Sequence, residues 1–260
     1  MSILNKIIVD KKREVELKKS LVPYAQLEQS HLFQSRTVSL SKNLRNSVTG
    51  IIAEHKRRSP SVGEINYNLT VEQVTKAYES AGACGISVLT DGKYFGGSND
   101  DLILARASVN VPLLRKEFII NEYQIIEAKS NGADAILLIA AVLTRSEIKK
   151  LSEFAQSLAL EVLLEVHDAA ELQKAIMPSL DMIGVNNRNL KTFQVDLQTS
   201  HTLAHHIPSD FVKVSESGIS TITSIKELQN TGYQGFLVGE LFMKSNDISA
   251  FTAHFIQSIK

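Results

Sequence analysis

Short apolar runs alternate with amphipathic stretches along the chain from residue 50 onward. Most of these runs are apolar throughout, which is typical of strands buried on both faces of a parallel sheet. The stretches between them carry apolar residues at helical spacing, most clearly at Ile148, Leu151, Ala155 and Leu158. The predicted strands cover residues 50–54, 85–90, 111–115, 135–140, 161–166, 182–186, 211–215 and 235–239.

Glycines mark the ends of three predicted helices. Gly82, Gly132 and Gly232 each follow a helical stretch and precede a strand, where a left-handed residue often ends a helix. Eight strand–helix units spaced about 20–30 residues apart are typical of a closed (β/α)8 TIM barrel. An open, doubly wound sheet is the alternative, but no Gly-x-Gly-x-x-Gly follows the first predicted strand. The sequence therefore predicts an α/β fold with a (β/α)8 barrel over residues 50–260.

Residues 1–49 lie outside this repeat and are predicted to form an N-terminal helical extension. Ile3, Ile7, Ile8, Val15 and Leu17 indicate one apolar face of an amphipathic helix. We expect the charged face to be solvated. It carries Lys11, Lys12, Arg13, Glu14, Lys18 and Lys19. Such a helix can cover one end of a barrel, and the sequence does not indicate which end.

Charge and composition exclude several classes of protein. The 260 residues include 28 Lys plus Arg, 28 Asp plus Glu and no Trp. This balance gives no electrostatic footprint for nucleic acid or an anionic membrane, so neither is an expected partner. No stretch approaches the roughly 18 apolar residues of a membrane span, and no apolar signal core forms near the start. We therefore expect a cytoplasmic globular protein.

The sequence predicts neither a disulfide nor a metal site. Cys84 is the only cysteine, which excludes an intramolecular disulfide and a multi-cysteine metal site. We expect it to pack in the core. His201, His205 and His206 have helical spacing but lack a third ligand, so we expect them on a solvated helix face.

Charged and polar residues gather at the ends of the predicted strands, where barrels of this kind place their chemistry. Glu54 and Lys56 share one side of the first strand, Lys116 follows the third, Glu165 is the last residue but one of the fifth, and Asn186 ends the sixth. Burying a charge costs several kcal/mol unless it is paired. Two lysines and two glutamates at one mouth indicate either a structural salt-bridge cluster or an acid/base site. We favour the acid/base site.

Two glycine-containing loops indicate an anion site at the same end. Ser217-Gly218 follows the seventh predicted strand, and Gly239-Glu240 follows the eighth. Barrels often bind phosphate at these loops, through backbone amides and a helix N-terminus. Together the two loops predict a small phosphorylated substrate.

The strand-end segments resemble those of the indole-3-glycerol phosphate synthase family, and the resemblance covers nearly the whole chain. Its most specific part is Glu-x-Lys-x-x-Ser-Pro-Ser at residues 54–61. The resemblance implies the substrate 1-(2-carboxyphenylamino)-1-deoxyribulose 5-phosphate. The family closes this compound into an indole ring with loss of carbon dioxide and water, without a metal or organic cofactor. The resemblance therefore implies that the protein is a carboxy-lyase of tryptophan biosynthesis. Further matching segments lie at residues 86–91, 114–119, 183–188, 215–219 and 236–240.

The resemblance also implies catalytic roles. Lys116 matches the general acid that protonates the sugar carbonyl during ring closure, and Lys56 matches the group that holds the substrate carboxylate. Glu165 matches the acid/base group of the dehydration. Glu54 and Asn186 match groups that orient the sugar hydroxyls and the aniline nitrogen. Which group acts in which proton transfer stays open.

The resemblance also implies two pockets and a pair of residues that support the catalytic groups. The phosphate pocket consists of Ser59, Ser217, Gly218, Gly239 and Glu240. The apolar pocket for the aromatic ring consists of Phe95, Phe118, Leu137 and Leu190. For Phe118 and Leu137, packing in the ordinary barrel core is an equally good interpretation. The supporting pair is Arg188 and Glu216.

The chain departs from the family pattern at Val62, Glu117 and Leu241, where Lys, Asp and a small residue are common. None of these departures removes a catalytic group. The alternatives are a sugar-phosphate isomerase, a Schiff-base aldolase that uses Lys116, and a barrel that has lost catalysis and serves as a binding module. Retention of the whole charged set argues against the last. The sequence leaves the oligomeric state and any association with other pathway enzymes open.

Overall fold

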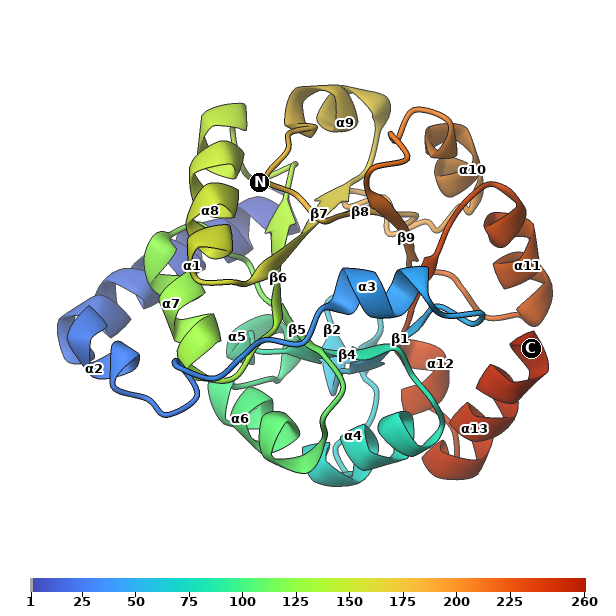
Figure 1. Ribbon diagram of the computed structural model, residues 1–260, viewed down its shortest axis with the longest axis horizontal. Coiled ribbons are helices and arrows are strands. Elements are labelled where there is room, and N and C mark those ends of the chain that lie inside the picture. The colour runs from blue at the N-terminus through green and yellow to red at the C-terminus, as the bar shows by residue number, and fades with distance from the viewer. Residues whose placement is uncertain (1) are drawn as a thin grey trace.

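The structure, a computed structural model that describes residues 2–260, confirms the (β/α)8 barrel and excludes the open sheet. Eight parallel strands close in the order β1-β10-β9-β8-β7-β6-β5-β4, with helices around them (Figure 1). The barrel strands are β1 (Ile51–His55), β4 (Gly85–Leu89), β5 (Leu113–Lys116), β6 (Ala135–Ile139), β7 (Glu161–Val166), β8 (Met182–Asn186), β9 (Val212–Glu216) and β10 (Gly235–Val238).

Helices connect successive barrel strands, and short extra elements follow some of the strands. Between residues 2 and 260, no helix combines the length and apolar content needed to cross a membrane. The longer connecting helices are α4 (Val71–Ser80), α6 (Asn99–Ser108), α7 (Glu122–Ser130), α8 (Arg145–Ser157), α9 (Ala169–Ala175), α10 (Gln198–Ala204), α11 (Ile222–Asn230) and α13 (Ile248–Ile259). The short elements are the hairpin of β2 (Arg58–Ser59) and β3 (Gly63–Glu64), and the helices α5 (Gly92–Phe95) and α12 (Glu240–Met243).

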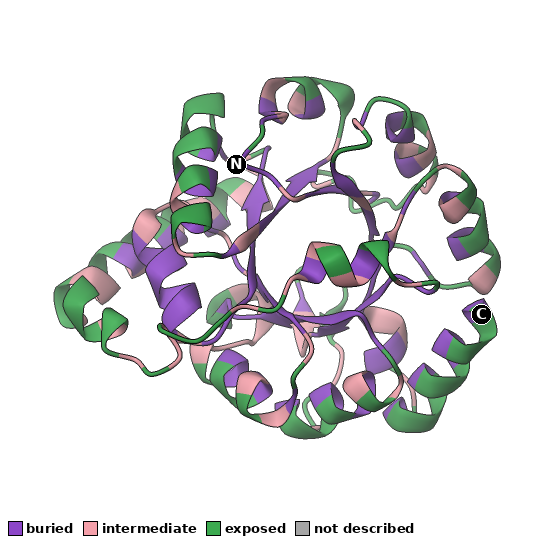
Figure 2. Cartoon of the chain, viewed as in Figure 1, coloured by how far each residue is buried: buried purple, intermediate pink, exposed green. Residues whose placement is uncertain are grey.

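Alternate residues of each strand pack on opposite sides of the barrel wall. Ile136 and Leu138 belong to the layer between strands and helices, whereas Leu137 and Leu163 fill the barrel interior. Figure 2 shows the buried strands inside a ring of helices whose outer faces are exposed. Near the carboxyl ends of the strands the inward positions become charged, as at Glu165. The alternation of side chains along each strand therefore places apolar residues in the barrel interior and polar residues at its mouth.

The observed boundaries differ little from the predicted ones, and β5 differs most. Residues 111–115 were expected, but the strand begins at Leu113, because Pro112 has no backbone N–H to donate to a ladder. Gly82, Gly132 and Gly232 follow α4, α7 and α11 with φ angles of 89°, 87° and 92°. The predicted glycine helix ends are thus confirmed.

The N-terminal residues form α1 (Ile3–Leu21), α2 (Tyr24–Glu28) and α3 (Leu40–Arg45), which contact both ends of the barrel. Leu40 and Leu44 of α3 are buried against the barrel interior, beside the first residues of β4 and β10. In Figure 1 α3 crosses this end of the barrel. At the other end Ile3, Leu4 and Ile7 of α1 line the mouth. The chain therefore closes the amino end of the barrel and narrows its carboxyl end.

The expectation of a fully solvated charged face on α1 is wrong for Lys11. Its side chain is only 2% exposed, and its Nζ lies 2.7 Å from Glu14, 3.0 Å from Asp91 and 3.0 Å from Glu117. Leu17, expected on the apolar face, is 60% exposed. The helix therefore turns a lysine toward the barrel, because two buried carboxylates compensate its charge there.

His55, next to Glu54 on β1, gives a first testable expectation. Neither of its ring nitrogens has a hydrogen-bond partner among the described residues. Burial, with the Arg57 guanidinium as the next cause, lowers the pKa of His55 from 6.5 to about 4. Between pH 6.5 and about pH 4 the imidazole is protonated in the unfolded chain and neutral in the folded one. The unfolded chain therefore binds more protons, and the free energy of unfolding falls as the pH falls. We expect His55→Leu to remove this loss.

Urea unfolding at pH 7 and pH 5 tests this expectation. Between pH 7 and pH 5 the free energy of unfolding should fall by about 1–2 kcal/mol more in the unsubstituted protein than in His55→Leu. His254→Leu, on the exposed surface of α13, is the control and should keep the native pH dependence. An unchanged pH dependence in His55→Leu would contradict the assignment to His55.

Candidate functional site

A cavity of about 1050 Å³ opens at the carboxyl ends of the barrel strands. Every residue predicted for the site lines this cavity, although these residues come from loops and strands throughout the chain. These residues are Glu54, Lys56, Ser59, Phe95, Lys116, Phe118, Leu137, Glu165, Asn186, Arg188, Leu190, Glu216, Ser217, Gly218, Gly239 and Glu240.

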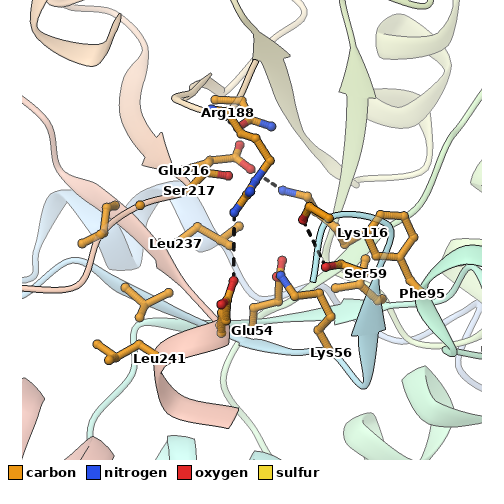
Figure 3. Close-up of a pocket in the computed structure, with 18 of the residues that line it drawn as sticks. Glu54, Lys56, Ser59, Phe95, Lys116, Arg188, Glu216, Ser217, Leu237 and Leu241 are labelled. Carbon is orange, nitrogen blue, oxygen red and sulfur yellow. Dashed lines mark hydrogen bonds and ion pairs between the residues drawn. The ribbon is translucent and has the colours of Figure 1, made fainter. Parts of the chain in front are cut away.

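A charged cluster occupies the floor of the cavity (Figure 3). Lys116 on β5 forms an ion pair with Glu216 on β9, and its Nζ lies 3.7 Å from Oε2 of Glu165 on β7. Glu54 on β1 lies 2.8 Å from the Nζ of Lys56 and accepts a hydrogen bond of 3.3 Å from Ser87. Three buried carboxylates therefore face two lysines, so the cluster carries one negative charge more than its lysines balance when all three are ionised.

The surroundings separate the pKa values of the carboxyl groups. Burial alone would raise the pKa of Glu54, but Lys56 and Lys116 lower it below its usual value. Burial raises the pKa of Glu216 to about 7 despite the pairing with Lys116, and Glu165 adds to this rise. Burial acts against the charged form of Lys116, yet the three carboxylates raise its pKa above the usual value. At neutral pH the cluster thus holds an ionised Glu54, a charged Lys116 and a Glu216 that titrates.

Two glycines in the barrel wall make room for these carboxylates. A Cβ on Gly184 would lie 2.3 Å from Oε1 of Glu216, and a Cβ on Gly239 would lie 2.9 Å from Glu54. Any side chain at either position would push a charged group out of place. Gly239, predicted from its place in a phosphate loop, therefore also sets the position of Glu54.

One side of the cavity is aromatic. The ring centroids of Phe95 on α5 and Phe118 after β5 lie 5.9 Å apart. Asp91 caps α5 by accepting hydrogen bonds from the backbone N–H groups of Tyr94 and Phe95. Ser59 lies on this side too, away from Ser217 (Figure 3). The arrangement offers an apolar slot with a hydroxyl beside it.

The opposite side consists of backbone turns. Ser217 and Gly218 have φ angles of 68° and 78°, and the left-handed conformation is uncommon for a serine. Asn187 holds this turn, because its Nδ2 donates to the carbonyl oxygens of Glu216 and Ser217 at 3.0 and 3.1 Å. Its Oδ1 accepts from Ser200 of α10. A turn fixed in this way presents backbone groups rather than charged side chains to a ligand.

Arg188 and Glu216, which the resemblance groups together, have different partners in the structure. Glu216 pairs with Lys116, whereas Nη2 of Arg188 lies 4.0 Å from Glu240. The loop after β8 carries Arg188 over the rim, while β9 holds Glu216 at the floor. The two residues therefore line the cavity through different contacts.

Sequence reasoning missed several residues of the site. Asn187 lies in the conspicuous run at the end of β8, but it supports the turn after β9, whereas its neighbours Asn186 and Arg188 line the cavity. Ile3 and Ile7 fit an apolar helix face, and nothing local indicates that this face covers the mouth. Among the departures from the family pattern, Leu241 lines the cavity, and Val62 lies at the exposed β2–β3 hairpin.

The histidines and the cysteine that the sequence singles out lie outside the cavity. Over residues 2–260, no group of three or more His, Cys, Asp or Glu side chains is arranged to hold a metal ion. α10 ends at Ala204, and His205 and His206 beyond it are exposed. Cys84 is buried against the barrel interior.

Comparison with known proteins gives one family over nearly the whole chain. The sequence profile described as indole-3-glycerol phosphate synthase matches residues 4–255. A protein of that name from Bacteroides thetaiotaomicron is 46% identical over 258 residues, which cover 99% of both chains. Proteins of the same name from Bacillus cereus and Azospirillum brasilense are 43% and 39% identical, and the alignments cover at least 96% of each chain.

Solved structures with low sequence identity share the architecture. The 3-hexulose-6-phosphate synthase of Salmonella typhimurium is 11% identical, with a TM-score of 0.63 over 81% of this chain and 98% of the other. A chain described as native KDPGal is 14% identical, with a TM-score of 0.57 over 80% of this chain and 91% of the other. At such identities the likeness shows the barrel fold alone.

Proposed function

The chain belongs to the indole-3-glycerol phosphate synthase family, and from this premise we propose which groups at the barrel mouth carry out the reaction. The reaction converts 1-(2-carboxyphenylamino)-1-deoxyribulose 5-phosphate into indole-3-glycerol phosphate, carbon dioxide and water, a step of tryptophan biosynthesis. The protein is thus a carboxy-lyase that acts on a small phosphorylated substrate.

The substrate spans the cavity from the aromatic side to the backbone turns. Its carboxyphenyl ring lies against Phe95 and Phe118, together with Leu137 and Leu190. Its phosphate lies at the opposite side, where the turns after β9 and β10 offer backbone N–H groups. The phosphate partners are Ser217, Gly218, Gly239 and Glu240, with Arg188 and Lys56 able to reach its charge. The two sides therefore fix the direction of the substrate, with its sugar carbon chain over the charged floor.

Lys116 is the general acid of the ring closure. As the aromatic carbon attacks the sugar carbonyl, negative charge develops on the carbonyl oxygen, and a proton must reach it. Three carboxylates keep Lys116 charged at neutral pH. An alkoxide is a stronger base than a lysine amine, so transfer of the proton remains favourable. Glu216, with a pKa of about 7, is the neighbouring group from which Lys116 regains a proton.

Lys56 and Ser59 hold the substrate carboxylate until it leaves as carbon dioxide. Loss of the carboxylate restores aromaticity after the attack, so its orientation must be kept during closure. The resemblance groups Ser59 with the phosphate. Its place beside Phe95 favours contact with the carboxylate on the aromatic ring instead (Figure 3). Lys56 is anchored by Glu54 at 2.8 Å and lies between the two ends.

Glu165 is the acid/base group of the final dehydration. It faces the cavity floor beside Lys116, where the hydroxyl that leaves is formed. Glu54 and Asn186 orient the remaining sugar hydroxyls and the aniline nitrogen. The observation that carries the whole proposal is the convergence of Lys116, Glu165 and Glu54 in one buried cluster between an aromatic slot and the backbone turns.

Glu165→Gln tests the dehydration step. We expect a loss of roughly 10²–10³-fold in turnover, because the amide can neither take nor give the proton. Carbon dioxide release should then run ahead of the rise in indole fluorescence, since ring closure and decarboxylation precede the blocked step. Glu153→Gln, on the exposed face of α8, is the matched control. A fully active Glu165→Gln would remove Glu165 from the acid/base set.

Borohydride treatment separates this reaction from a Schiff-base aldolase. In the proposed mechanism Lys116 transfers a proton and forms no covalent bond. Incubation of the protein with substrate and borohydride should therefore leave Lys116 unmodified when peptides are analysed by mass spectrometry. Efficient trapping of substrate at Lys116 would support the aldolase and contradict the proposed acid role.

A further inference from the structure

His167 lies directly behind Glu165 and has no part in the mechanism above. It follows the last residue of β7, and its side chain is 12% exposed. Its Nε2 lies 3.4 Å from Oε1 of Glu165, and its Nδ1 lies 3.1 Å from Oε2 of Glu171. The ring lies outside the cavity lining, and Glu165 is the cavity residue within 4 Å of its nitrogens.

The two oxygens of Glu165 face different cationic groups. Oε2 lies toward Lys116 and the cavity floor, whereas Oε1 lies toward the imidazole of His167. The buried Nε2 makes no hydrogen bond among the described residues, which is costly for a polar atom. Glu165 is the carboxylate nearest to Nε2, at 3.4 Å. The geometry thus assigns one oxygen of Glu165 to the cavity and the other to the histidine.

Glu171 on α9 holds the imidazole from the outer side. The same Oε2 that faces Nδ1 also accepts the backbone N–H of His167 at 2.8 Å. The charged groups that face the ring are Glu165 on β7, Glu171 on α9 and Glu216 on β9, with Lys116 of β5 beyond Glu165. Burial acts to lower the pKa of His167, but the hydrogen bond that its ring donates to Glu171 and the charge of Glu165 raise the pKa above its usual value. The surroundings therefore favour the imidazolium.

We propose that His167 is a positioning residue, whose imidazolium holds Oε1 of Glu165 so that Oε2 alone acts as the acid/base atom toward the substrate. This inference rests on the role proposed for Glu165. Without the ring, the carboxylate of Glu165 gains rotational freedom and loses a cation 3.4 Å away. Both losses disfavour the reactive geometry of the carboxylate.

The test uses His167→Phe and the more conservative His167→Gln. We expect His167→Phe to lower kcat by roughly 10–100-fold, with KM within about twofold, because the substrate itself loses no contact. The acid limb of the kcat–pH profile should move upward by about one pH unit, since an opposite charge within 4–6 Å has been removed. His167→Gln keeps a hydrogen-bond donor without the charge, so it should recover part of kcat but keep the shift. His205→Gln, exposed after α10, is the matched control.

A double variant separates positioning from a general structural role. If His167 acts through Glu165, adding His167→Phe to Glu165→Gln should cause no further loss of kcat. Independent, multiplying losses would overturn the inference, as would an unchanged kcat and pH profile in His167→Phe. Either result would leave the role of Glu165 standing if Glu165→Gln alone is impaired. A fully active Glu165→Gln would overturn that role and this inference with it. Should His167→Phe fail to fold in a thermal scan, His167→Gln and its double variant with Glu165→Gln decide the matter by the same criteria.

Discussion

Lys116→Met should abolish ring closure and leave the barrel folded. The variant removes the proton donor of the first chemical step, and we expect turnover to fall at least about 10³-fold, within the range of general acid–base catalysis. Buried carboxylates lose their cation, but Glu216 already has a pKa of about 7 and can take up a proton to become neutral. The fold therefore has a way to compensate the missing charge. The chain contains no Trp, so indole fluorescence reports the product without a protein background.

Lys116→Arg separates proton donation from simple charge. The guanidinium restores a cation beside Glu216 and Glu165, but it does not release its proton in proteins. If Lys116 acts as an acid, Lys116→Arg should retain less than about 1% of turnover despite its charge. Lys76→Met, which removes an exposed lysine from α4, is the control for loss of one positive charge. Near-normal turnover of Lys116→Met would contradict the mechanism, whereas recovery in Lys116→Arg would reduce the role to electrostatic stabilisation.

The pattern of apolar residues was sufficient to predict the barrel. A strand buried on both faces needs a continuous apolar run, and the eight runs appear in the sequence without knowledge of their partners. The short elements were not predicted, because the hairpin of β2 and β3 and the helices α5 and α12 are too brief to show a period. The division of the chain at residue 49 stays a prediction.

The site was predictable where a residue is out of place in its own strand. Glu54 and Glu165 are charged at inward positions, and this anomaly needs no knowledge of the rest of the fold. The pairing of Lys116 with Glu216 joins residues 100 positions apart, and local sequence carries no information on which carboxylate a lysine meets. For the same reason Lys11 was placed on the solvated face of α1. Its partner Glu117 belongs to a strand end that no helical pattern can reveal.

Lys11→Met should destabilise the protein more than any other substitution on α1. It leaves Asp91 and Glu117 buried without the cation between them, and breaking a buried ion pair from one side costs about 3–5 kcal/mol. Glu117 directly follows Lys116, and Asp91 caps the helix that carries Phe95. Loss of Lys11 should therefore also loosen the acid and the aromatic slot, and we expect KM to rise about tenfold. Urea unfolding and steady-state fluorescence kinetics measure the two effects.

A second substitution tests whether Lys11→Met acts through uncompensated charge or through lost packing of α1. In the double variant of Lys11→Met with Glu117→Gln, one uncompensated carboxylate is gone, so part of the lost stability should return. Lys12→Met changes the adjacent, exposed lysine of the same helix and should leave both stability and KM unchanged. If Lys11→Met behaves like Lys12→Met, the buried lysine does not hold α1 on the mouth. If the double variant is less stable than Lys11→Met alone, Glu117 depends on its other hydrogen bonds, from Thr90 and the Phe118 backbone, more than on Lys11. Recovery of KM together with stability in the double variant would show that the uncompensated charge of Glu117 causes both defects of Lys11→Met.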